Sequence, residues 1–274
     1  MNNFNPQPKI KPRVLATDLD GTLIPLPGRE NNVADLKTIA AARASENFEI
    51  VFATGRHFES AMEAMETQKL PEPDWIVCDV GSSIYHKVGH DFIPYEPYVA
   101  HLDETTGGVD RQTIQELIAS IKGMELQSPD HQQRFKISYQ CASEKVEELI
   151  DAVSQKIEHA VLPFSAMGSV DPFLNCGLID VLPAGVTKAY ALLWLATHAD
   201  FMPDEVIYSG DSGNDLAALT SGFRAIIVGN ASTGLEGKVR SQLAARNLEA
   251  RLYVAQSEAT SAVLEGCRYF KLIP

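Results

Sequence analysis

Six short apolar runs, each stopping abruptly at polar or turn residues, restrict the fold of this 274-residue chain more than any other feature. Runs of four to six apolar residues bounded in this way are typical of strands buried in a parallel sheet. Helix-like stretches at residues 33–44 and 59–65 follow the first two expected strands, and a third at 187–197 follows the stretch 180–183 and precedes the strand at 205–209. The alternation predicts an α/β fold with a doubly wound parallel sheet. The six expected strands are residues 13–17, 48–53, 75–78, 205–209, 223–228 and 252–255.

The alternation is interrupted in the middle of the chain, where Gly and Pro become more frequent. Two helical stretches, 111–122 and 144–158, flank residues 135–141, which alternate like a half-exposed strand. The proline-containing stretch 94–97 is expected to be a loop. These features predict an inserted α+β domain, with the first pattern resuming after it. The expected division is a core made of residues 1–83 and 180–274, with the inserted domain at 84–179.

The composition excludes several classes of partner. The chain has 36 acidic and 23 basic residues, a formal charge of −13, which argues against a nucleic-acid binder or a protein that binds anionic lipid. Apolar runs are far shorter than the ~20 residues of a membrane span, and residues 1–12 lack the apolar segment of a secretory signal. Four widely spaced cysteines without a CxxC pair indicate reduced thiols. We therefore expect a cytoplasmic protein, and the oligomeric state stays open.

Polar clusters follow three of the expected strands. They are the pair Asp18 and Asp20, the stretch 54–56, and the group Asp211, Asn214 and Asp215. Because ligand crevices of open α/β sheets lie beyond the carboxyl ends of the strands, the clusters are expected to converge there. Lys188, at the start of an expected helix, would join them. Carboxylates packed this closely repel one another, and a hard divalent cation such as Mg2+ would relieve the repulsion.

The same residues could assemble a phosphate site. Thr54 offers a hydroxyl, the Gly55 backbone permits close approach, and Lys188 supplies positive charge. A carboxylate facing phosphorus can attack it to form an aspartyl-phosphate. A second carboxylate can protonate the leaving alkoxide and then deprotonate water.

Each cluster alone also has a structural explanation. Asp18 to Gly21 could form a turn, Asp211 and Thr54 could cap helices, and Lys188 could be a solvated surface residue. Their occurrence together, each at a strand end or a helix start, favours the functional interpretation.

Residues 18–22, 54–56, 188 and 210–215 resemble the four motifs of the haloacid dehalogenase superfamily. The resemblance implies a Rossmann-like core, Mg2+ and phosphoryl transfer. It implies that Asp18 is the nucleophile and Asp20 the general acid and base. The implied phosphate and substrate contacts are Thr54, Gly55, Arg56, Lys188 and Asn214. The implied metal ligands are Asp18, the backbone carbonyl of Asp20, Asp211 and Asp215.

The inserted domain resembles the larger α/β cap of that superfamily. Within that superfamily the chain is similar to sucrose-phosphate phosphatases, on the stretches 79–85, 133–139 and 180–188. This resemblance implies a sugar-phosphate substrate, with sucrose 6-phosphate as the leading candidate. Cap residues Gln133, Arg134 and Lys136 could bond sugar hydroxyls, or they could merely solvate a loop. Phosphatases for mannosylglycerate-, trehalose- or hexose-phosphates, a phosphomutase, and a non-catalytic sugar-phosphate-binding partner subunit stay open. Residues 25–28 receive no role.

Overall fold

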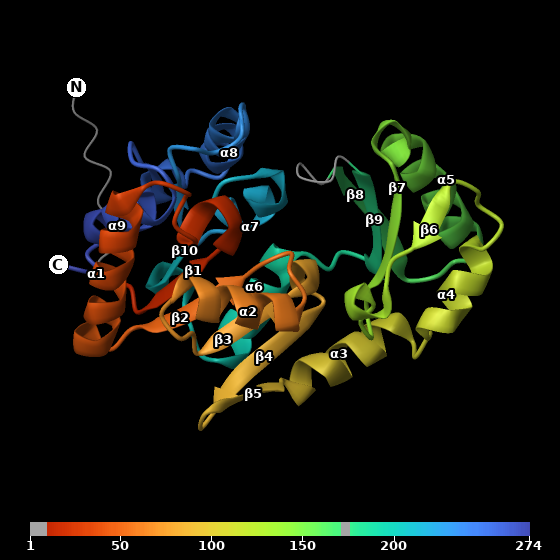
Figure 1. The fold of residues 1–274 in the computed structure, drawn as a ribbon, viewed down its shortest axis with the longest axis horizontal. Coiled ribbons are helices and arrows are strands. Elements are labelled where there is room, and N and C mark those ends of the chain that lie inside the picture. Colours follow the sequence, from red (N-terminus) through yellow and green to blue (C-terminus); the bar gives the residue numbers. More distant parts are fainter. Residues whose placement is uncertain (1–9, 171–175) are drawn as a thin grey trace. The chain divides into compact units, whose positions relative to one another are not determined.

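The computed structural model describes residues 10–170 and 176–274. It divides into two compact units, one made of Met1–Ile93 with Thr187–Pro274 and the other of Pro94–Val186. Figure 1 shows both units as ribbons. The first unit contains the expected polar clusters, and the second is inserted between two of them.

An eight-stranded sheet forms the first unit, in the order β12-β11-β10-β1-β2-β3-β4-β5. The strands from β12 to β3 are parallel, and β4 pairs antiparallel with β3. The order grows outward from β1 in both directions, which is the expected doubly wound α/β arrangement. The strands are β1 (Val14–Thr17), β2 (Glu49–Ala53), β3 (Trp75–Cys78), β4 (Ser83–Val88), β5 (Asp91–Pro94), β10 (Val206–Gly210), β11 (Arg224–Ile227) and β12 (Leu252–Val254).

Helices cover this sheet and bury its central strands. Helix α1 packs against α9, and α7 contacts both α6 and α8. Buried apolar residues of α1, α2 and α9 join those of the strands in one core cluster. Burial on both faces explains why β1 and β2 are almost continuously apolar. The helices are α1 (Glu30–Glu46), α2 (Phe58–Gln68), α6 (Lys188–His198), α7 (Leu216–Leu219), α8 (Leu235–Ala244) and α9 (Ala259–Tyr269).

A four-stranded antiparallel sheet, in the order β6-β7-β9-β8, forms the inserted unit. Its core cluster combines apolar residues of this sheet with those of α4 and α5. The strands are β6 (Met124–Leu126), β7 (Ile137–Ala142), β8 (Phe164–Val170) and β9 (Cys176–Pro183). The helices are α3 (Glu96–Thr106), α4 (Arg111–Ile118) and α5 (Val146–His159).

The structure moves two segments relative to the expected division at 83/84 and 179/180. Residues 84–93 stay with the core unit, because β4 pairs with β3 and β5 follows it in the sheet. Residues 180–186 stay with the inserted unit, because β9 runs between β7 and β8. The stretch 94–97 is not simply a loop, since α3 begins at Glu96 and Pro97 occupies its first turn. Proline is favoured there, because its missing N–H would have no helical partner.

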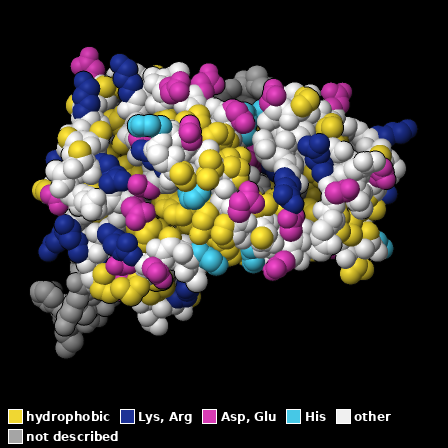
Figure 2. Space-filling view, turned by 90° about the horizontal axis from the view of Figure 1, so that it is seen from below, with side chains coloured by type: hydrophobic (Ala, Val, Ile, Leu, Met, Phe, Trp, Pro, Cys, Tyr) yellow, Lys and Arg dark blue, Asp and Glu magenta, His cyan; other side chains and the backbone are white. Residues whose placement is uncertain are grey.

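The surface carries charged side chains of both signs, in keeping with the 36 acidic and 23 basic residues of the sequence. On the face drawn in Figure 2, acidic and basic side chains of the described residues are interspersed, without a continuous basic tract. None of the helices within residues 10–170 and 176–274 has both the length and the apolar character to cross a bilayer. The four cysteines are free thiols, and Cys78 and Cys267 are buried.

Candidate active site

The candidate site lies at the carboxyl ends of neighbouring strands. Asp18 directly follows β1, and Asp211 directly follows β10. The parallel register opposes Thr17 and Ser209, and the Asp18 N–H donates to the Ser209 carbonyl over 3.0 Å. The sheet thus brings together two carboxylates that are almost two hundred residues apart in the chain.

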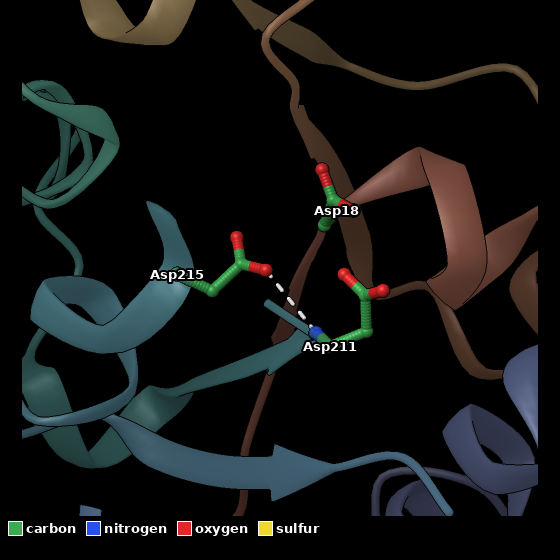
Figure 3. A group of neighbouring side chains, drawn as sticks. All are labelled: Asp18, Asp211 and Asp215. Carbon is green, nitrogen blue, oxygen red and sulfur yellow. Dashed lines mark hydrogen bonds between the residues drawn. The ribbon is translucent and has the colours of Figure 1, made fainter. Parts of the chain in front are cut away.

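Three carboxylates converge at this point (Figure 3). One oxygen each from Asp18, Asp211 and Asp215 lies within 4.8 Å of the others. Asp215 comes from the turn that precedes α7, and one of its oxygens accepts the Asp211 and Ser212 N–H groups, both at 3.1 Å. The other oxygen accepts the Tyr208 hydroxyl over 2.6 Å. Both oxygens of Asp215 are therefore held by hydrogen bonds.

Lys188, the first residue of α6, is a completely buried cation. Its Nζ lies 2.6 Å from Asp18 Oδ1 and 2.9 Å from Asp215 Oδ1. It also donates to Asn214 Oδ1 over 3.3 Å. A single ammonium thus bridges the end of β1 and the turn after β10, and Lys188 and Asn214 lie with the acidic residues, where the sequence places them, while their contact with substrate stays a prediction.

The electrostatics of the cluster favour an additional positive charge. Burial raises the pKa of Asp18 although Lys188 opposes the shift. Burial and the nearby Asp215 charge raise the pKa of Asp211 to about 6. Burial alone would lower the pKa of Lys188, but the attraction of Asp18 and Asp215 raises it. One lysine therefore does not offset the repulsion among three carboxylates.

These donors fit a small, hard divalent cation. Mg2+ prefers oxygen ligands and binds through a few carboxylates together with water. Asp18, Asp211 and Asp215 supply such oxygens within one ion's reach, while no sulfur or imidazole belongs to this group. The chemistry of the donor set is thus that expected of Mg2+ rather than of a soft metal.

Thr54 and Arg56 occupy the end of the neighbouring strand β2. Thr54 is buried, and its Oγ1 accepts the Arg56 N–H over 3.1 Å. The Arg56 guanidinium donates to both oxygens of Asp20 at 2.7 Å and to Ser60 Oγ at 2.9 Å. Arg56, expected at the substrate, is therefore engaged with Asp20, whose carboxylate lies outside the three-carboxylate cluster.

The three expected cap residues all lie in the inserted unit. Gln133 makes a long bond of 3.4 Å to the Asp130 carbonyl, and Arg134 pairs with Asp103 over 2.6 Å. Lys136 is buried, with its Nζ 3.8 Å from an oxygen of Asp180. Their contact with a sugar stays a prediction.

Two residues that contribute to the site were not found from the sequence. Tyr208 is the central residue of an apolar strand and looks like an ordinary core aromatic. Asn230 donates to the Gly21 carbonyl from a loop that follows β11. A Gly-Asn pair directly after a strand was the available signal for Asn230, since it lies at the same edge of the sheet as the acidic clusters.

Fold and site together define a hydrolase of the haloacid dehalogenase superfamily that acts on phosphoric monoesters. The family model described as sucrose-6F-phosphate phosphohydrolase matches residues 11–271. The chain therefore belongs to the sucrose-6F-phosphate phosphohydrolase family. The superfamily and the sucrose-phosphate phosphatase branch expected from the sequence are both confirmed.

Individual relatives support this assignment. The chain is 29% identical over 265 residues to a HAD-like hydrolase of Nitrosococcus oceani, covering 94% of this chain and 71% of that protein. It is 26% identical over 264 residues to the mannosylfructose-phosphate phosphatase of Agrobacterium fabrum, covering 96% and 98%. It spans only 27% of the glucosylglycerol-phosphate synthase of Pseudomonas anguilliseptica that it matches.

A solved structure covers nearly the whole chain. It is the sucrose-phosphatase of Synechocystis sp. PCC6803 in complex with sucrose and phosphate. The TM-score is 0.75 at 27% sequence identity, covering 96% of this chain and 99% of that one. The α/β fold with a parallel-rich core sheet, expected from the sequence, is thus shared with a solved relative.

Proposed function

We propose that this chain hydrolyses sucrose 6-phosphate to sucrose and inorganic phosphate, through an aspartyl-phosphate on Asp18. The observation that carries the proposal is the Asp18 carboxylate, 2.6 Å from the buried Lys188 ammonium and in one cluster with Asp211 and Asp215. The family match and the sucrose and phosphate bound to the Synechocystis relative support the choice of substrate. The inserted unit would act as the cap that recognises the sugar.

In the first half-reaction, an Asp18 oxygen forms a bond to phosphorus as the bond from phosphorus to the sugar oxygen breaks. Asp20 gives its proton to that oxygen, so that the sugar leaves as an alcohol. Lys188 and Thr54 hold the phosphoryl oxygens and offset their charge. Mg2+, held by Asp18, Asp211, Asp215 and the Asp20 carbonyl, would supply further charge neutralisation.

In the second half-reaction, the Asp20 carboxylate takes a proton from water. The resulting hydroxide attacks phosphorus, the bond from phosphorus to Asp18 breaks, and inorganic phosphate leaves. Asn214, beside Lys188, would orient the phosphoryl group.

A second substrate has specific support. The Agrobacterium fabrum mannosylfructose-phosphate phosphatase aligns over 98% of its length, so the phosphate of that disaccharide is the main competitor. We would compare kcat/KM for sucrose 6-phosphate, mannosylfructose phosphate, trehalose and mannosylglycerate phosphates, and hexose phosphates. A sharp preference for sucrose 6-phosphate supports the proposal. Equal kcat/KM values across hexose phosphates would indicate a generalist phosphatase. Transfer of the phosphoryl group to a sugar acceptor would indicate a mutase. The absence of any phosphate release would indicate a non-catalytic binding subunit.

Replacing Asp20 with Asn is expected to leave a phosphoenzyme that persists. The variant lacks the base that activates water, so the aspartyl-phosphate on Asp18 should form slowly and decay more slowly still. Acid quenching followed by intact-protein mass spectrometry detects the added phosphoryl group. If no phosphoenzyme is detected with the natural substrate, Asp20 does not have the acid and base role.

Removing divalent metal is expected to stop hydrolysis, and added Mg2+ should restore it. Without the cation, the repulsion among Asp18, Asp211 and Asp215 is uncompensated, and the substrate's negative charge adds to it. Phosphate release is measured after exhaustive chelation and again after titration with Mg2+. Calcium, which is larger and less strict in geometry, is the control cation. Full activity in the chelated protein contradicts the metal assignment.

A further inference from the structure

Asn230 connects two parts of the chain that flank the cation site. Its Nδ2 donates to the Gly21 carbonyl over 2.7 Å, and its Oδ1 accepts the Ala259 N–H, also at 2.7 Å. Gly21 belongs to the turn Leu19–Leu23 that follows the nucleophile, and Ala259 is the first residue of α9. Both ends of this one side-chain amide are therefore fixed to backbone.

The Gly21 turn lies directly against a carboxylate of the cluster. A Cβ added to Gly21 would sit 2.5 Å from Asp211 Oδ2 and 3.6 Å from Asn230 Nδ2. Gly21 also has a φ of +73°, a conformation that favours glycine. Because the turn and the carboxylate are in contact, any displacement of the turn changes the space around Asp211.

The loop that carries Asn230 also holds Asp211 itself. The Ser232 N–H donates to the Asp211 carbonyl over 2.7 Å, and the Gly229 N–H donates to the Ser257 carbonyl over 2.8 Å. One short loop therefore fixes Asp211 through its backbone and the Gly21 turn through the Asn230 side chain. Asp18 and Asp211 follow separate strands, and this loop connects the segments that carry them beyond the strand ends.

We propose that Asn230 is a positioning residue for the cation site. It sets the spacing between Asp211 and the Gly21 turn, which directly follows Asp18. The inference deepens the proposed function and rests on it for the identity of the cation as Mg2+. Groups that orient metal ligands without touching the metal typically change its affinity 10- to 100-fold when they are removed. Asn230 has the geometry of such a group.

The test is cation binding by Asn230→Ala, measured without substrate. Mn2+ is the probe, because its free-ion EPR signal falls on binding, and Mg2+ is then titrated to displace it. The rise of the unfolding temperature with Mg2+ gives a second readout. We expect the dissociation constants for both ions to increase at least about tenfold. An Asn230→Ala protein that binds both ions as tightly as the wild type overturns the proposal.

Asn32→Ala is the matched control. Asn32 is a buried asparagine that also holds α9, donating to the Glu258 carbonyl at 3.0 Å and to Ser261 Oγ at 2.8 Å. None of the bonds described for it reaches Gly21 or Asp211. Its loss should lower the unfolding temperature while leaving Mn2+ and Mg2+ binding at the wild-type level. Equal weakening in both variants would show that general bracing of α9, rather than Asn230, sets the affinity.

Asn230→Ser provides the same comparison if the alanine variant does not fold, since serine keeps a polar group but is too short to bridge both partners. Wild-type protein that binds Mn2+ but releases no phosphate from any sugar phosphate would refute the proposed function and leave this inference testable. Wild-type protein that binds neither ion would refute the inference.

Discussion

Asp18→Asn is expected to lower kcat by at least about a thousandfold, while the unfolding temperature stays level or rises. The amide of asparagine is a poor nucleophile and cannot form the aspartyl-phosphate. Its amide oxygen can still accept a hydrogen bond from the Lys188 ammonium, which lies 2.6 Å from the Asp18 carboxylate in the wild-type protein. Removing one of three clustered carboxylates also relieves repulsion, and burial already raises the pKa of Asp18, so its ionised form is costly.

Phosphate release and thermal unfolding, measured on the same preparation, test this expectation. Asp91→Asn is the matched control, because Asp91 is an exposed residue of β5 and should retain wild-type values in both assays. A sugar phosphatase activity of Asp18→Asn within tenfold of the wild type would contradict the nucleophile assignment. An unfolding temperature that falls sharply would instead show that the carboxylate is chiefly structural.

The parallel part of the core sheet could be predicted because its strands are buried on both faces. Residues 14–17 and 49–53 are almost entirely apolar and stop at polar residues, so both the strand and its functional end are visible in the sequence. The strand ends then bring Asp18, Asp211, Asn214 and Asp215 together, because neighbouring parallel strands share one edge, and Lys188 joins them from the start of α6. This part of the site needed only the fold class and the order of the motifs.

Other elements depend on partners that the sequence does not display. Strand β8 (Phe164–Val170) contains Gly168 and has few buried positions, and its conformation follows from pairing with β9. A Cβ at Gly168 would lie 2.3 Å from Ile150 of α5, so this glycine reflects close packing rather than a turn. The expected boundaries of the inserted unit differ from the observed ones for the same reason, since β4 pairs with β3 in the core sheet and β9 pairs with β7 and β8 in the inserted one.

Side-chain pairing could not be predicted at all from the motif pattern. Arg56 was expected to contact the substrate, which stays a prediction, and its guanidinium donates to both oxygens of Asp20 at 2.7 Å. Only the direction of the long arginine side chain distinguishes these two roles, and no local sequence rule fixes it. Asn230 could not be identified from the sequence for a similar reason, because its hydrogen bonds join residues that are far apart in the chain.

Lys188→Met is expected to lower the free energy of unfolding by about 3–5 kcal/mol and to remove activity, because it leaves buried carboxylates without their cation. The Lys188 side chain is completely buried and touches Asp18 at 2.6 Å and Asp215 at 2.9 Å. Methionine has a similar length but no charge, so packing is largely kept while the compensation is lost. Denaturant unfolding measures the change. Lys87→Met, which breaks a partly exposed pair with Glu72, should cost at most about 1 kcal/mol.

The pH dependence and a second substitution separate electrostatics from packing in Lys188→Met. Burial raises the pKa of Asp18 in the folded protein, so the folded state binds more protons than the unfolded one and loses stability as pH rises. Without Lys188 this shift grows, and the deficit should be larger at about pH 8 than at about pH 5. Adding Asp18→Asn should recover part of the lost stability, and Mg2+ should narrow the remaining gap because it replaces the missing positive charge. A deficit that is independent of pH, of Asp18 and of Mg2+ would mean that Lys188 acts through packing alone.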